Sequence, residues 1–179
     1  LTPGTLENLP RNVGLLPNVK LFEAGDRLAV DGFELDSFTV WHDAADPVSY
    51  AVRWGGGQLG LATDLGKVSN VVRERLTGSH ALILESNYCP NMLRDSSYPA
   101  AIRQRIRGSH GHLSNADMNS LLADLIHDQL QWVIAVHISQ ENNTADLARS
   151  MAQRDLGKHP AQLFLAEQDA PTPLFQIAV

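Results

Sequence analysis

Hydrophobic and polar residues alternate like those of β-strands in the first half of the chain. Within residues 27–41, Phe33 and Leu35 share one phase, whereas Phe38 and Val40 share the other. This change of phase predicts a bulge, or a strand that is covered on both faces. Residues 48–54 and 58–64 alternate on either side of three glycines, which predicts a hairpin. The first twenty residues, rich in Pro, Gly and Asn, are expected to form mainly loop.

After Asp64, helical patterns alternate with strand-like patterns along the chain. Residues 118–126 have the i, i+3, i+4, i+7, i+8 apolar spacing of an amphipathic helix, and Ser114 with Asp117 forms a capping-box pattern before it. Further helices are expected over residues 68–76, 98–107 and from Asn143 or Thr144 to about Arg154. Short apolar runs predict strands at residues 81–84, 132–136, 163–165 and 174–179. Strands followed by alternating helices and buried strands predict an α/β fold, with a mixed sheet and covering helices.

The composition and net charge of the chain limit which functions are plausible, and they say less about the fold. A chain of 179 residues that is 44% hydrophobic suits a single domain, residues 1–179. The net charge of −6 does not attract nucleic acid, so a nuclease would have to rely on a local site. A single cysteine fits a reducing compartment, and a cytoplasmic location is expected. No apolar run approaches the roughly 18 residues of a membrane span, so no membrane partner is expected.

Four predicted strands end in a residue that can bind a metal or move a proton: His42, Asp64, Glu85 and His137. In open α/β sheets, side chains converge just beyond the carboxyl ends of the strands. Imidazole and carboxylate ligands suit zinc, manganese or iron, and the lack of nearby cysteines argues against a structural zinc site. Singly, each could be an ordinary loop or turn residue. Their convergence favours His42, Asp64 and His137 as metal ligands, with Glu85 as an acceptor for a histidine N–H.

The segment Ser109–Asn115 places two histidines around a glycine, directly before a helix. Free backbone N–H groups at a helix start favour an anion such as phosphate, so His110, Ser114 and Asn115 are candidates for substrate binding. A histidine here can act as a general acid toward a leaving group, the role predicted for His112. The alternative is that Ser114 merely caps the helix while the histidines lie in solvent.

A third polar run, His137–Asn143, directly follows an apolar strand. A plain helix start would explain Asn143 or Thr144 but not the whole run. Asn142 is therefore a further candidate for substrate binding.

Together these segments resemble the metallo-β-lactamase-fold hydrolases, and most nearly their YycJ/WalJ-type, exonuclease-like branch. The matching stretches occur in the expected order and are His42–Tyr50, Ala62–Gly66, Leu84–Tyr88, Gly111–Asn115 and His137–Asn143. Five ordered matches are far more specific than any one of them.

The resemblance implies an αββα sandwich, of which this chain is the C-terminal portion. By position, His42 resembles a metal ligand, Asp64 the carboxylate that bridges two metals, and His137 the final histidine ligand. The implied cofactors are two divalent ions, with zinc favoured and manganese or iron as alternatives. The implied substrate is nucleic acid or a small phosphodiester, and the implied reaction is attack of a metal-activated hydroxide on phosphorus. His112 would bind the phosphate or protonate the leaving oxygen, which makes Asp64 and His112 the expected catalytic residues.

One signature of the family is missing. None of the seven histidines belongs to an HxHxDH motif. We interpret the chain as lacking the N-terminal portion that carries this motif. Removing half of a two-sheet sandwich exposes an apolar face, so self-association or a missing N-terminal segment is expected. Two alternatives stay open: a same-fold hydrolase of thioesters, lactones or small cyclic phosphates, and a truncated, catalytically silent fragment that binds or regulates a partner.

Overall fold

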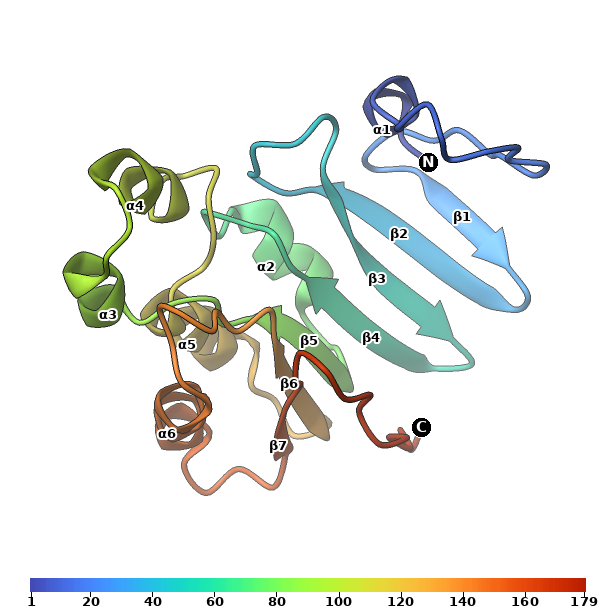
Figure 1. Ribbon diagram of the computed structural model, residues 1–179. Helices are drawn as coiled ribbons and strands as arrows, with labels where there is room; N and C mark the ends of the chain where they lie inside the picture. Colours follow the sequence, from blue (N-terminus) through green and yellow to red (C-terminus); the bar gives the residue numbers. More distant parts are fainter.

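The computed structural model describes residues 1–179 and contains one seven-stranded sheet, whose strands lie in the order of the sequence (Figure 1). The strands are β1 (Arg27–Val30), β2 (Phe33–Thr39), β3 (Val48–Trp54), β4 (Gly57–Ala62), β5 (Ala81–Glu85), β6 (Trp132–Val136) and β7 (Gln162–Leu165). Strands β1 to β4 are antiparallel, and β4 to β7 are parallel. This mixed sheet with covering helices confirms the predicted fold class.

Six helices accompany the sheet. They are α1 (Pro3–Glu7), α2 (Asn70–Leu76), α3 (Pro90–Asp95), α4 (Ala100–Ile106), α5 (Asn115–Leu125) and α6 (Ala145–Leu156). None of them is both long enough and apolar enough to cross a membrane. Ser114 caps α5 by accepting from the Asp117 N–H, and Thr144 caps α6 in the same way, so both predicted helix starts are confirmed.

Residues 27–41 do not form the single strand that the pattern suggested. Asp31 and Gly32 both have positive φ, at 47° and 87°, and turn the chain back between β1 and β2. An Asp-Gly pair readily adopts this hairpin turn, and it accounts for part of the irregular phase. The second part is coverage on both faces, because Asp36, Ser37 and Phe38 are buried in succession.

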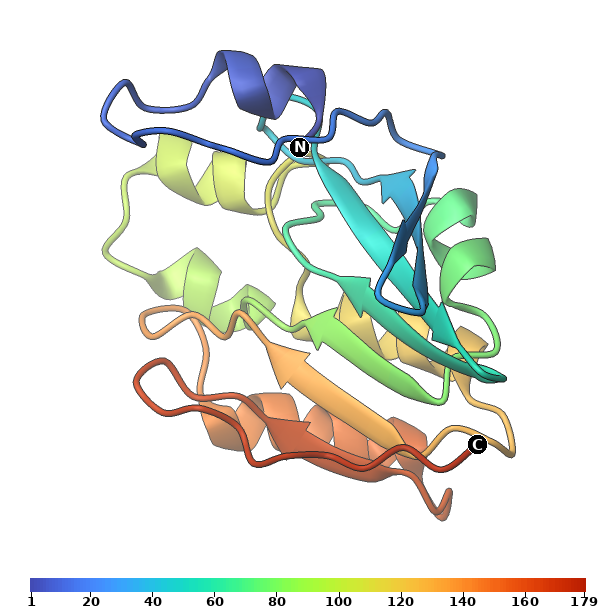
Figure 2. The ribbon, with the colours of Figure 1, turned by 90° about the vertical axis from the view of Figure 1, so that its right-hand side faces the viewer.

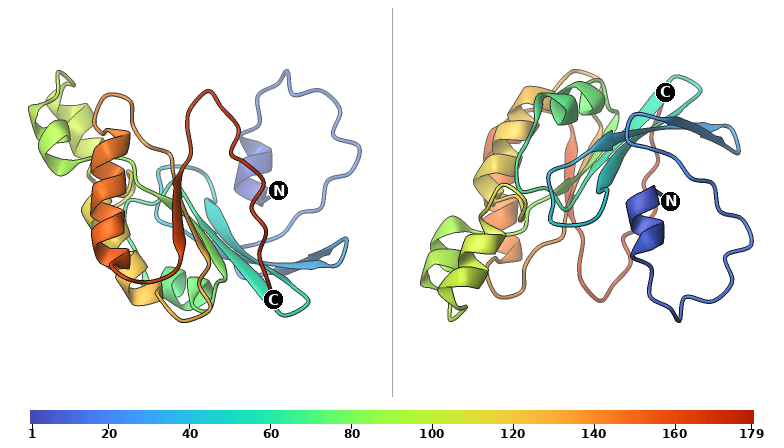
Figure 3. Two further views of the ribbon diagram at one scale, coloured as in Figure 1. Left: turned by 90° about the horizontal axis from the view of Figure 1, so that it is seen from below. Right: turned by 90° about the horizontal axis from the view of Figure 1, so that it is seen from above.

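Helices α2, α5 and α6 cover one face of the sheet (Figures 2 and 3). The side chains of Leu82, Leu84 and Val133 point to this face and are fully buried against the helices. Met118, Leu121 and the other apolar positions of α5 complete the same core, as their spacing predicted.

The opposite face of the sheet is also apolar. Paired positions along β3, β4 and β5 place Val52, Leu59, Leu61 and Ile83 on this side, and all four are half-buried. The N-terminal segment, which includes the short helix α1, and the C-terminal tail lie over this side (Figure 3). A sheet that is apolar on both faces is typical of one half of a layered sandwich.

Three local predictions differ from the structure. Helices α1 and α3 were not expected, and both are short and begin with proline. The predicted strand at residues 174–179 is absent, although the tail packs Phe175 against Trp132 at 4.8 Å between ring centroids. The side chain of Gln131 bonds to both the N–H and the carbonyl of Ala178, so side chains, and no backbone ladder, hold the tail.

Candidate metal centre

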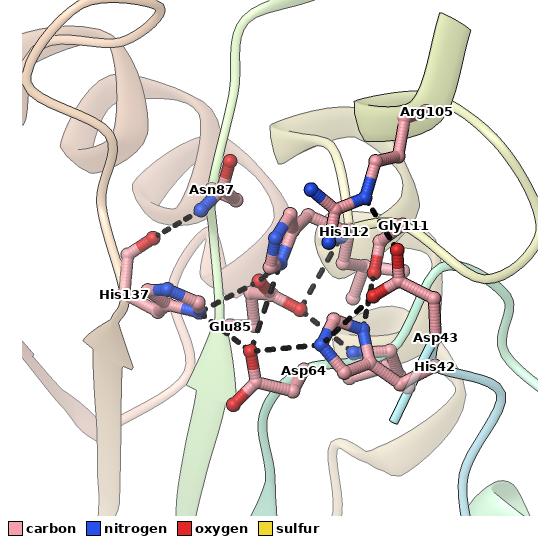
Figure 4. Close-up of polar contacts among 11 residues, drawn as sticks. His42, Asp43, Asp64, Glu85, Asn87, Arg105, Gly111, His112 and His137 are labelled. Carbon is pink, nitrogen blue, oxygen red and sulfur yellow. Dashed lines mark hydrogen bonds and ion pairs between the residues drawn. The ribbon is translucent and has the colours of Figure 1, made fainter. Parts of the chain in front are cut away.

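The predicted site residues gather where β4, β5 and β6 end. Asp64 lies just beyond β4, Glu85 is the last residue of β5, and His137 follows β6. His42 reaches the same place from the loop after β2, and His112 from the loop before α5 (Figure 4). Parallel strands explain this meeting, because their carboxyl ends lie at one edge of the sheet.

Two of these residues adopt an unusual backbone conformation. Asp64 and His137 have φ values of 53° and 56°, in the left-handed region that non-glycine residues rarely occupy. His137 directly follows β6, and Asp64 lies two residues after the end of β4, so the chain turns away where these strands end. The side chain of Asn87 supports the second turn by donating to the His137 carbonyl at 2.9 Å. Such strain concentrates at functional sites.

Asp64 lies at the centre of three imidazoles. Its Oδ1 is 3.7 Å from Nε2 of His42, 3.8 Å from Nδ1 of His112 and 3.5 Å from Nδ1 of His137. Figure 4 shows His42 on one side of the carboxylate and His137 on the other. Nδ1 of His42 is 2.9 Å from the Gly111 carbonyl, which can only accept, so Nδ1 carries a proton, and the neutral ring in this orientation has its lone pair on Nε2.

Glu85 accepts hydrogen bonds from two of these three rings. Its side chain is fully buried, and Oε1 accepts from Nδ1 of His112 at 2.7 Å and of His137 at 2.9 Å. The other oxygen, Oε2, accepts from the backbone N–H groups of Leu65 and Leu113. Burial raises the pKa of the Glu85 carboxyl, but the hydrogen bonds from the two histidines and Leu65 outweigh it and lower that pKa. The bond to Glu85 in turn raises the pKa of His137.

This donor set fits a divalent metal ion. One ligand atom from each of Asp64, Glu85, His112 and His137 lies within 4.8 Å of the others. Ligand atoms about 2.1 Å from a tetrahedral zinc ion stand roughly 3.4 Å apart, close to the 3.7 Å between Nε2 of His42 and Oδ1 of Asp64. Because Nδ1 of His112 and Nδ1 of His137 donate to Glu85, each of these two rings would bind a metal through Nε2. His42 is not part of this group of four and approaches Asp64 from another side. Glu85 supports the rings in the way that carboxylates support metal-binding histidines in other proteins.

Three residues predicted to bind substrate lie inside the protein. Ser114 is 3% exposed and caps α5, while Asn115 is fully buried and accepts from the Ser86 hydroxyl at 2.8 Å. Asn142 is 1% exposed, and its side-chain oxygen has no partner. Asn143 completes this network by donating to Asn115. These side chains fix the loops around the site from within, and direct contact with substrate stays a prediction for them.

His110 is placed differently from His112. It is exposed, and its ring packs on Trp41 with 5.3 Å between the ring centroids. The amino group of Lys67 lies 5.3 Å from the centre of the same Trp41 ring. His110 therefore lies at the rim of the site, where it can reach a bound substrate without touching Asp64.

The loop that carries His112 is packed tightly against α4. The His112 N–H donates to the Ile106 carbonyl at 2.8 Å, and a Cβ atom at Gly111 would overlap the carbonyl oxygens of Arg105 and Ile106. Only glycine fits here, because the backbones approach too closely for a side chain. The sequence shows this glycine between two histidines, but the close approach of the two backbones is visible only in the structure.

Replacing Gly111 by alanine should therefore displace the backbone of the loop that carries His112 and so disturb the site. The chain must shift to admit the methyl group, which we expect to cost about 2–3 kcal/mol and to move both His112 and the carbonyl that binds His42. Thermal unfolding and metal titration measure the two effects. Gly108→Ala is the matched control, because its Cβ would meet nothing closer than 3.2 Å. Equal behaviour of the two variants would contradict this account.

Fold and site together define the class of protein. The chain superposes on the metallo-β-lactamase fold protein YhfI of Bacillus subtilis with a TM-score of 0.62, at 14% identity, over 83% of this chain and 52% of that one. No family model matches the chain. The superposition nevertheless shows that the seven-stranded mixed sheet and its covering helices have the fold of this metallo-β-lactamase fold protein.

Within that class, its sequence is similar to two curated exodeoxyribonucleases. It is 38% identical to exodeoxyribonuclease YycJ of Bacillus anthracis over 129 residues, which are 72% of this chain and 49% of that protein. It is 30% identical to exodeoxyribonuclease WalJ of Streptococcus pneumoniae over 163 residues, 88% of this chain and 61% of that protein. The chain thus spans about half to three-fifths of the length of these relatives.

Proposed function

We propose that this chain carries the metal site of an enzyme that hydrolyses phosphodiester bonds in DNA and removes nucleotides from a DNA end. The supporting observation is Asp64, whose Oδ1 lies within 3.8 Å of three histidine rings at the strand ends. The similarity to proteins named exodeoxyribonucleases supports DNA as the substrate.

The proposed ligands are His42, Asp64 and His137, with Asp64 shared between two ions where two are bound. Zinc is the favoured ion, because imidazole nitrogen and carboxylate oxygen suit it, and manganese or iron are alternatives. A divalent ion at this place activates water and stabilises charge on phosphate oxygens. His112 is partly exposed and stands beside Asp64, so it is the residue proposed to bind the phosphate or protonate the leaving oxygen.

Self-association and a cytoplasmic location belong to the same proposal. Apolar residues on the face of the sheet opposite α2, α5 and α6 are only half-buried, Leu59, Leu61 and Ile83 among them. They favour a partner layer, supplied by a second copy or by another segment. Light scattering checks this point, and a strictly monomeric chain that binds no apolar dye would count against it. The single cysteine supports the proposed compartment.

The test of the proposed activity is digestion of end-labelled DNA by the purified chain with zinc or manganese. We expect stepwise loss of terminal nucleotides, which a chelator stops and which Asp128→Asn leaves unchanged. Asp128 is an exposed aspartate between α5 and β6, far from the strand ends that carry the site. The same samples are offered a thioester and a lactone.

Each contrary outcome favours a different alternative. Hydrolysis of the thioester or lactone with DNA left intact would replace the proposed substrate class with the first alternative. Bound metal without hydrolysis of any substrate would favour the silent binding fragment.

A further inference from the structure

Helices α3 and α4 concentrate positive charge in an acidic protein. Residues 90–107 contain four arginines, Arg94, Arg103, Arg105 and Arg107, and a single acidic residue, Asp95, in a chain with a net charge of −6. The two helices stand beyond the strand ends that carry the metal centre (Figure 1). These arginines do not form a continuous basic run in the sequence, because a turn between α3 and α4 separates Arg94 from the other three.

Three of the four arginines line one groove. Its volume is about 450 Å³, and its walls include Arg94, Arg103, Arg107, Tyr88, Asn91 and Gln104. We refer to it as the arginine groove. Its volume lies within the roughly 300–1,000 Å³ typical of ligand sites, and its lining combines guanidinium groups, amides and one aromatic ring. Tyr88 is buried, so the guanidinium groups are the part of this lining that can contact the backbone of a nucleic acid.

The arginine groove adjoins the metal centre through the backbone. The N–H of His112 bonds to the carbonyl of Ile106, the residue before Arg107. Tyr88, three residues after Glu85, forms a bridge with Ser114, two residues after His112. A hydrogen bond and a bridge thus join the loop of residues 108–114, which carries His112, to the chain next to Arg107 and to Tyr88 in the wall of the groove.

The arginines differ in how far the protein already uses them. Arg94 is paired with Asp95, and Arg103 donates to the carbonyls of Arg94 and Ser96, which ties α4 to the end of α3. Arg107 makes neither an ion pair nor a side-chain hydrogen bond, although it is exposed in the groove. An arginine without a partner beside two others is placed to bind an anion.

We infer that the arginine groove binds the phosphate backbone of a single DNA strand and guides its end to the metal centre. The inference rests on the proposed function and deepens it by placing the substrate strand on α3 and α4. Such binding is electrostatic and independent of base sequence, because guanidinium groups contact phosphate oxygens.

The test measures binding without turnover. Fluorescence anisotropy of a short labelled single-stranded oligonucleotide is recorded across a range of NaCl concentrations, with a chelator present. Arg107→Gln should weaken binding roughly fivefold and lower the slope of log K against log salt by about 0.7, the value for one phosphate contact on a single strand. Arg107→Lys should retain most of the affinity, and Arg94→Gln combined with Arg107→Gln should weaken binding further.

The matched control is Arg154→Gln, the same change on α6 away from the groove, which should bind like the unaltered chain. Thermal unfolding midpoints check that all variants are folded. Unchanged affinity and slope in both groove variants would overturn the inference, as would equal displacement of DNA by polyglutamate and by unlabelled DNA. If the chain hydrolyses DNA and the groove variants bind DNA normally, the groove inference is wrong and the proposed activity stands. If the chain binds DNA through the groove but cleaves no DNA, the proposed activity is wrong and the groove inference stands.

Discussion

Asp64→Asn should remove metal from the chain and abolish any hydrolysis that depends on it. The change keeps the size of the side chain but replaces the charged oxygen that lies 3.5–3.8 Å from three histidine nitrogens. Changes to residues that merely support metal ligands lower affinity about 10- to 100-fold, so loss of a shared ligand should lower it at least about 100-fold. Plasma mass spectrometry of the purified chain and zinc titration measure the effect.

The fold itself should survive this change. Asp64 is half-exposed, and asparagine tolerates the left-handed backbone that Asp64 adopts. The thermal midpoint without metal should therefore stay within a few degrees of the unaltered chain. Near-stoichiometric zinc in Asp64→Asn would rule out the carboxylate as the shared ligand.

Glu85→Gln should damage stability and metal binding together. The fully buried Glu85 accepts four hydrogen bonds, and glutamine replaces one accepting oxygen with a donor that must face either the histidines or the N–H groups of Leu65 and Leu113. Loss of a charged acceptor and creation of an unpaired buried donor should cost about 3 kcal/mol. Metal affinity should fall about 10- to 100-fold, because the rings of His112 and His137 lose their common support.

Urea denaturation of the metal-free chain separates the two effects. The control is Glu74→Gln, an exposed glutamate on α2, which should change neither quantity measurably. Full stability together with full zinc affinity in Glu85→Gln would show that its hydrogen bonds do not hold the site.

The parts of the fold that follow from periodic patterns were predictable. The amphipathic spacing of α5 and the apolar run of β6 matched the structure because burial on one or both faces dictates them. Elements fixed by local backbone chemistry were harder. The Asp31-Gly32 turn was overlooked, and the C-terminal tail looked like a strand although Gln131 occupies its backbone groups.

The residues of the site were likewise predictable in part. Side chains at the ends of neighbouring parallel strands converge by topology, so the sequence could indicate His42, Asp64 and His137 as a set. It could not show that Glu85 accepts from two histidines at once, because that depends on the register of β5 with β6. It gave different roles to His112 and His110, but it could not show that His112 lies beside Asp64 while His110 packs on Trp41.

The backbone at His137 also bears on how the sequence can evolve. A histidine in the left-handed conformation is held at a disadvantage of about 1–2 kcal/mol, which glycine would avoid. The backbone conformation alone thus favours glycine or asparagine at this position, whereas the hydrogen bond to Glu85 and a requirement for the imidazole as a metal ligand oppose the exchange. In a descendant that no longer needs the metal, this histidine should be among the first site residues to drift. Its presence or loss among sister sequences would then distinguish lineages still under selection for the site from those that have abandoned it.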